Sequence, residues 1–149
     1  MKTVTIFGSS IPGEGTEVYK ETQQLGRRLA EAGFAVCNGG YGGLMEASAR
    51  GARESGGHTI GVTCNVWPAA ANRWIAEEVR TPTFMQRLLT LIERGDSYIV
   101  LPGGTGTLAE LALEMLFPAD DETVRIVSSM AAKLPVQEPR ALAGGAPDA

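Results

Sequence analysis

Three glycine-rich segments of this chain could hold an anion with their backbone. They are Gly8-Ser9-Ser10, the run from Asn38 to Gly43, and Pro102-Gly103-Gly104-Thr105-Gly106-Thr107. Successive glycines between a strand and a helix let backbone N–H groups approach a ligand, and the N-terminus of the helix adds partial positive charge. These segments therefore predict a phosphate site. The alternative for the two longer segments is that glycine only forms a tight turn or lets a helix lie close to a sheet.

Two charged side chains are candidate functional residues. Glu110 falls in the first turn of the helix expected after the third segment, where a carboxylate near N-terminal amides stays ionised and can face a ligand. Ordinary helix capping is the alternative. Arg87 falls at the start of the preceding helix, one position before its apolar face, and a solvated arginine is the alternative there.

The sequence argues against three other kinds of phosphate- or nucleotide-binding site. A triphosphate-binding P-loop needs a lysine after its last glycine, but the chain has lysine only at positions 2, 20 and 133. The same scarcity argues against a pyridoxal-phosphate Schiff base. The run from Gly104 to Ala109 matches the dinucleotide pattern GxGxxG/A, yet it follows the fourth expected strand instead of the first. A dinucleotide-dependent oxidoreductase is therefore a weaker hypothesis, and no cofactor is predicted.

The elements that position these residues are predicted from hydrophobic periodicity. Strands are expected at Thr3–Phe7, Phe34–Cys37, Thr59–Thr63, Tyr98–Leu101 and Val124–Val127, and helices at 15–32, 44–54, 84–92 and 108–115. Alternating strands and helices predict an α/β fold, a single doubly wound, Rossmann-like parallel sheet with helices on both faces. Ligands of that class bind at the carboxyl ends of the strands, so the three glycine-rich segments should converge on one edge.

The composition indicates one globular domain. The chain has 149 residues, 44% of them hydrophobic, and a net charge of −4 with scattered basic residues, so no nucleic-acid polymer is expected as a partner. No apolar run approaches the roughly 18 residues that span a membrane, and the N-terminus lacks a signal pattern, which predicts a cytoplasmic protein. We expect the domain to cover residues 1–130 and an Ala/Gly/Pro-rich tail to cover 131–149.

Several further side chains have a structural interpretation. Cys37 and Cys64 lie in apolar stretches and are expected to be reduced core residues, and one histidine, His58, is too few for a zinc site. In the loop Val66–Ile75, the aromatic residues either cover a base or pack a dimer, and the sequence leaves both open. These aromatic residues are Trp67 and Trp74, with Asn72 between them.

The glycine-rich segments also carry a family resemblance. Pro102–Glu110 matches the PGGxGTxxE motif of the LOG (Lonely Guy) family, also labelled lysine decarboxylase-like or Rossmann-fold nucleotide-binding proteins. Gly39–Met45 resembles the GGxxGLM element of that family, and Ile6–Ser10 resembles its opening strand and loop. The resemblance runs from about residue 3 to 117 and implies a doubly wound homodimer. It also implies hydrolysis of the N-glycosidic bond of nucleoside 5′-monophosphates, including cytokinin nucleotides, to a free base and ribose 5-phosphate, without a metal.

The resemblance assigns roles to residues. Its catalytic arginine and glutamate correspond to Arg87 and Glu110. The expected substrate- and phosphate-binding residues are Gly8, Ser9, Ser10, Gly39, Gly40, Gly43, Met45, Gly103, Gly104, Thr105, Gly106 and Thr107. The chain departs from the family where Leu88 follows Arg87 in place of a common lysine, and where Ala109 and Glu46 replace a common acid and a common glycine.

Two interpretations of the whole chain follow. The first is a phosphoribohydrolase, in which a carboxylate such as Glu110 stabilises oxocarbenium charge, holds ribose hydroxyls or orients water. The second is a protein that binds a nucleotide or phosphorylated cofactor without turnover. A homodimer is expected from the family and from apolar helix faces that exceed what one sheet covers. These faces comprise Leu88, Leu91, Ile92, Leu111 and Met115.

Overall fold

The parallel sheet expected from the sequence is present. The computed structural model describes residues 1–104, 107 and 125–126. Within them, six parallel strands lie in the order β4-β3-β2-β1-β5-β6. The strands are β1 (Thr3–Phe7), β2 (Ala35–Asn38), β3 (Thr59–Cys64), β4 (Glu77–Thr81), β5 (Ser97–Val100) and β6 (Arg125–Ile126), and the helices are α1 (Glu17–Glu31), α2 (Leu44–Glu54) and α3 (Phe84–Arg94).

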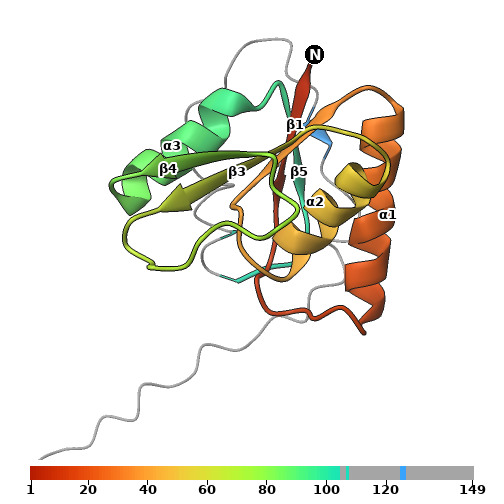
Figure 1. Ribbon diagram of the computed structural model, residues 1–149, viewed down its shortest axis with the longest axis horizontal. Coiled ribbons are helices and arrows are strands. Elements are labelled where there is room, and N and C mark those ends of the chain that lie inside the picture. The colour runs from red at the N-terminus through yellow and green to blue at the C-terminus, as the bar shows by residue number, and fades with distance from the viewer. Residues whose placement is uncertain (105–106, 108–124, 127–149) are drawn as a thin grey trace, which may run out of the picture.

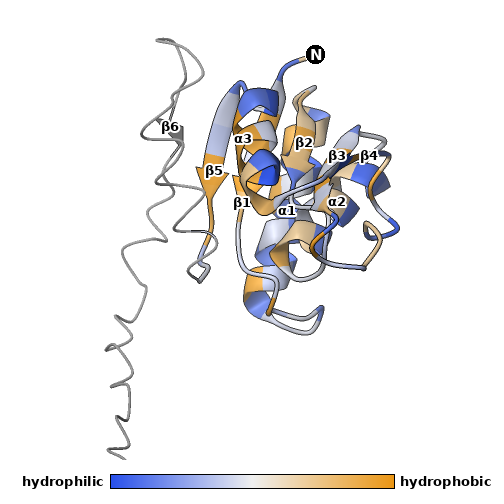
Figure 2. Ribbon diagram, turned by 90° about the vertical axis from the view of Figure 1, so that its left-hand side faces the viewer, coloured by the Kyte–Doolittle hydropathy of each residue, from blue (hydrophilic) through white to orange (hydrophobic). Residues whose placement is uncertain are grey.

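Helices cover both faces of the sheet, which confirms the doubly wound class. On one face, Val4 and Ile6 of β1 pack with Leu44 of α2, and Leu25 of α1 lies against this cluster. On the other face, β1 contributes Phe7 to a second cluster that includes residues of α3. Figure 1 shows α1 and α2 on one side of the strands and α3 on the other, and Figure 2 colours much of β1 and β5 as hydrophobic.

The strand order creates a crevice at the carboxyl end of β1. From β1 the chain moves outward through β2 and β3 to β4, and it then returns through α3 to place β5 on the other side of β1. The chain therefore continues in opposite directions along the sheet from β1 and from β5, to β2 on one side and to β6 on the other. This topological switch point is where open α/β sheets bind ligands.

The sequence analysis missed strand β4. Its residues alternate between partly buried and exposed positions, and Glu77, Glu78 and Arg80 make it strongly charged. Charged residues are typical of edge strands, because they discourage pairing with another chain, but they hide the apolar alternation on which the prediction relied.

The helix predicted over 108–115, the domain boundary near residue 130 and the tail lie outside the described residues. None of the described helices is long and apolar enough to cross a membrane.

Candidate functional site

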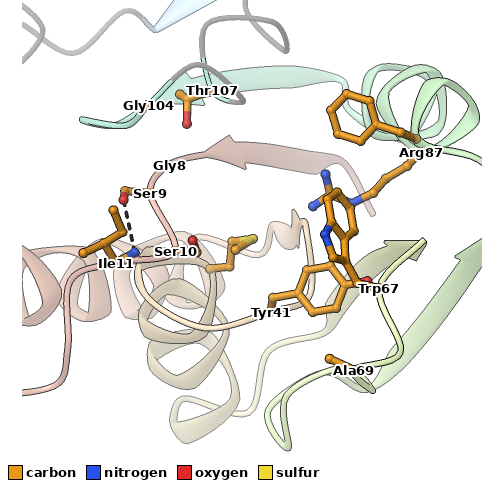
Figure 3. Close-up of a pocket in the computed structure, with 12 residues that line it drawn as sticks. Gly8, Ser9, Ser10, Ile11, Tyr41, Trp67, Ala69, Arg87, Gly104 and Thr107 are labelled. Atoms are coloured by element: carbon orange, nitrogen blue, oxygen red, sulfur yellow. Dashed lines mark hydrogen bonds between the residues drawn. The ribbon is translucent and has the colours of Figure 1, made fainter. Parts of the chain in front are cut away.

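A cavity of about 620 Å³ opens at the carboxyl edge of the sheet, a size typical of small-molecule sites. Its lining comes from the loops after β1, β2, β3 and β5 and from the first turns of α2 and α3 (Figure 3). The lining residues are Gly8, Ser9, Ser10, Ile11, Tyr41, Met45, Trp67, Ala69, Phe84, Arg87, Gly104 and Thr107. The three glycine-rich segments thus meet at one edge, as their positions in the sequence predicted.

The loop after β1 is held between its two neighbours. The backbone N–H of Ser9 donates to the carbonyl of Pro102 at 3.2 Å, and the carbonyl of Ser9 accepts from the N–H of Leu44 at 2.9 Å. The hydroxyl of Ser9 accepts from the N–H of Ile11 at 3.1 Å, which tightens the turn (Figure 3). These bonds join the ends of β1 and β5 to the start of α2, so the small polar wall of the cavity is fixed in place.

Arg87 forms part of the opposite wall. Its Nε donates to the carbonyl of Val62 at 2.8 Å, and its Nη2 donates to the carbonyl of Gly39 at 3.2 Å. The guanidinium carbon lies 5.6 Å from the ring centroids of both Tyr41 and Trp67, within cation–π range. Arg87 is only 5% exposed, so the alternative of a solvated arginine is wrong. The contacts hold its positive charge at the ends of β2 and β3.

Gly39 and Gly40 lie behind the lining. A side chain at Gly39 would overlap the guanidinium of Arg87 and would come within 2.6 Å of the sulfur of Met45. The N–H of Gly40 donates to Oδ1 of Asn38 at 2.8 Å, so this donor is used within the protein. Gly39 lets the β2 loop close around Arg87, and Gly40 lets it lie against Gly61 and Thr63 of β3. The contact of both glycines with phosphate stays a prediction.

The remaining predicted residues fall into three groups. Gly8, Ser9, Ser10, Met45, Gly104 and Thr107 line the cavity together with Arg87. Gly43 lies against the backbone of Ser10, and Gly103 lies against the side chain of Thr107. The other three predicted residues, Thr105, Gly106 and Glu110, lie outside the described residues.

Aromatic residues of the site were not assigned to it from the sequence. Tyr41 and Phe84 line the cavity, and both lie edge-on to Trp67, with centroid distances of 5.8 and 5.7 Å. The hydroxyl of Tyr41 accepts from the N–H of Cys64 at 3.0 Å, which ties its ring to the end of β3. For Tyr41, the sequence did offer a signal, because this residue lies inside a glycine-rich loop that was predicted to bind a ligand. For Trp67, the sequence left open whether it covers a base or packs a dimer. Phe84 had no local signal, because only the fold brings it to the cavity.

The cysteines and His58 lie away from ligand chemistry. Cys37 and Cys64 are free and buried, and burial raises the pKa of the Cys37 thiol to about 12, which keeps it protonated. Nε2 of His58 lies 3.2 Å from Oε2 of Glu77, whose other oxygen accepts from Nη1 of Arg94 at 3.0 Å. In the part of the chain that the structure describes, no His, Cys, Asp and Glu side chains group in threes to hold a metal ion.

Comparisons with known proteins agree with this fold. The family model described as the SLOG cluster4 family matches residues 1–133. Enzymes named cytokinin riboside 5′-monophosphate phosphoribohydrolase from Rhodococcoides fascians and Mycobacterium tuberculosis are each 35% identical over 73% of the chain. The chain spans 57% and 59% of their lengths. The X-ray structure of TM1055 has a TM-score of 0.68 and 32% sequence identity, and the match covers 75% of this chain and 67% of that one.

Proposed function

Because this chain belongs to the SLOG cluster4 family, which confirms the LOG resemblance of its motifs, we propose that it hydrolyses nucleoside 5′-monophosphates. The reaction releases the free base and ribose 5-phosphate. We take AMP and modified adenine nucleotides, including cytokinin nucleotides, as the substrates. The relatives named for this activity support the proposal.

The observation that carries this proposal is the division of the cavity into two chemically different walls. Small polar residues of the β1 and β5 loops form one wall, and Arg87 with aromatic rings forms the other. A phosphate suits the first wall, because close backbone approach and hydroxyl donors favour an anion. A flat base suits the second. The scissile bond then lies between them, within reach of a positive charge.

The reaction needs charge stabilisation at both ends of the breaking bond. The C1′–N bond breaks with its electron pair passing to the base, a water oxygen bonds to C1′, and a water proton ends on the base. The guanidinium of Arg87 would stabilise negative charge developing on the base. The carboxylate of Glu110 would stabilise the oxocarbenium-like ribose, hold its hydroxyls or orient the water.

Substitution of Glu110 tests the enzymatic proposal. We expect the protein to release base from 5′-AMP but not from adenosine, and Glu110→Gln to lower kcat by about 100-fold or more, the usual effect of losing a group that stabilises transition-state charge. Base release measured by chromatography checks this. Glu93→Gln, which removes an exposed carboxylate of α3, is the matched control and should retain the parent rate. Unchanged hydrolysis in Glu110→Gln would contradict the assignment.

Binding without turnover is the second candidate, and the setting of Arg87 favours it. Two of its donors bond main-chain carbonyls, which is what a residue holding strand ends together would do. In that case AMP would bind to the parent protein, as measured by calorimetry, and no base would be released at any protein concentration.

We also propose a homodimer, on a surface different from the one that the sequence indicated. Leu88, Leu91 and Ile92 are buried at 3%, 0% and 4% exposure and are part of the core of the monomer, so they cannot form the contact. Met85 and Leu89, one helical turn apart on α3, are 54% and 37% exposed. We expect a species of twice 15.7 kDa in sedimentation at micromolar concentration. Leu89→Glu should give the monomer, and a monomeric parent would contradict the proposal.

A further inference from the structure

The aromatic wall of the cavity has an open surface that packing does not account for. Trp67 contacts the edges of Tyr41 and Phe84 and has Arg87 over its ring, and yet 40% of its surface remains exposed. It lines the cavity. Exposing a large aromatic ring inside a concave site leaves apolar area unburied, and a flat ligand would cover it.

The segment that carries Trp67 is fixed from two sides. Arg80 of β4 donates from Nη2 to the carbonyl of Trp67 at 3.2 Å and from Nη1 to the carbonyl of Ala69 at 3.4 Å. The side chain of Asn72 donates to the carbonyl of Tyr41 at 2.8 Å. These bonds fix the main chain that carries the indole, so a ligand would not have to order this segment on binding. They also give Asn72 a structural role.

Trp67 and the polar loops lie on different sides of the same cavity. Figure 3 shows Ser9, Ser10 and Thr107 on the side of the cavity opposite to Trp67, with Arg87 beside the indole. If the polar loops hold the phosphate, the base reaches the indole, and the ribose lies between the two walls. This step rests on the proposed function, because it uses the predicted phosphate position.

We propose that Trp67 recognises the base by stacking and thereby makes the site selective for purine over pyrimidine nucleotides. Stacking strengthens with the overlap of the two ring systems, and the two fused rings of indole overlap a two-ring purine more than a one-ring pyrimidine. The rings of Phe84 and Tyr41 stand nearly perpendicular to the indole, at 86° and 78°. Trp67 is thus a specificity residue, whereas Arg87 supplies positive charge.

The two tryptophans of the chain allow a direct test by fluorescence. The chain contains only Trp67 and Trp74. Trp74 does not line the cavity, its ring lies 4.7 Å from the guanidinium carbon of Arg73, and its buried Nε1 has no hydrogen-bond partner in the described part of the chain. Trp74→Phe therefore removes an unpaired donor and should fold. In this variant Trp67 is the only tryptophan.

We expect AMP to quench the emission of Trp74→Phe in a saturable way, and ribose 5-phosphate, which lacks the base, to bind without quenching. In the reverse variant, Trp67→Phe, AMP should leave the emission of Trp74 unchanged. Quenching of Trp74 instead of Trp67, or AMP binding without any quenching, would overturn the proposal. So would the absence of AMP binding to the parent protein by calorimetry.

Affinities then test the selectivity. Trp67→Ala should weaken AMP binding by about tenfold or more, the usual effect of removing a stacking partner, and should weaken UMP and ribose 5-phosphate much less. Trp67→Phe should recover part of the loss, and Trp74→Phe should bind like the parent. Equal affinities of the parent for AMP and UMP would overturn the proposal, as would parent-like AMP binding by Trp67→Ala. Purine-selective quenching without base release would overturn only the enzymatic function.

Discussion

At the scale of single residues, the site depends on a position where no side chain fits. Gly39 was interpreted from the sequence as a phosphate ligand, but the guanidinium of Arg87 occupies the space that its side chain would need. The same guanidinium donates to the Gly39 carbonyl at 3.2 Å. The absence of a β-carbon at this position therefore lets an arginine approach the end of β2 and present its charge to the cavity.

Gly39→Ala should displace Arg87 and lower kcat/KM by about 100-fold, because small misplacements of a reacting group have effects of that size. Base release from AMP, compared with the melting temperature, checks this. Gly15→Ala is the control, since a side chain there meets no other atom within 4 Å and both properties should stay near those of the parent. Parent-like activity of Gly39→Ala would show that the position of Arg87 does not limit the reaction.

At the scale of elements, α3 brings the charge and part of the aromatic wall to the cavity. It begins after Thr83, whose hydroxyl accepts from the N–H of Gln86 at 3.2 Å and so caps the helix. Leu88, Leu91 and Ile92 then hold the helix on the sheet. The first turn, between cap and core, is where Phe84 and Arg87 enter the cavity.

Thr83→Ala should destabilise the protein by about 1 kcal/mol, the usual cost of a lost N-cap, and lower the melting temperature by about 2–4 °C. Thr83→Ser keeps the hydroxyl and should melt like the parent, which calorimetry can measure for all three proteins. If Thr83→Ala and Thr83→Ser melted alike, the cap would not contribute to the stability of the folded protein.

At the scale of the whole molecule, a group of charges ties the sheet edge to the helix layer. Glu77 of β4 bonds both His58, which precedes β3, and Arg94 at the end of α3. The hydrogen bond from His58, followed by the charge of Arg94, lowers the pKa of Glu77 below its ordinary value. A carboxyl whose pKa is lower in the folded state stabilises the protein above its unfolded pKa, and this contribution is lost as the pH falls through the folded pKa.

Glu77→Gln should therefore melt at a lower temperature than the parent at pH 7, and this difference in melting temperature should disappear as the pH falls through the lowered pKa of Glu77, where the carboxyl of the parent also becomes protonated. Melting curves between pH 2 and pH 7 check this. Glu31→Gln, which changes an exposed carboxylate of α1, serves as the control. If the melting temperatures of Glu77→Gln and the parent differed by the same amount at every pH, the stabilisation by Glu77 would not come from its charge.

Much of the fold could be predicted from the sequence, because its helices and strands depend on local patterns of residues. Helix α2 begins and ends where its apolar spacing and the flanking glycines indicated, and β1 covers the expected five residues. The meeting of the three glycine-rich segments also followed, since all parallel strands end at one edge. Strand β4 could not be predicted, because its charged residues hide the alternation of apolar and polar positions that marks a strand in the sequence.

The sequence alone determined the fold class, the family motifs and the edge of the sheet at which the cavity opens, because each of these depends on patterns of residues that are close in the chain. Only the tertiary structure decided how Arg87 and Trp67 are used. Arg87 is buried because it reaches carbonyls that lie 25 and 48 residues before it in the sequence. Trp67 joins the cavity because Arg80, 13 residues later, holds its carbonyl. Such contacts leave no periodic pattern, since they form only when distant strand ends come together.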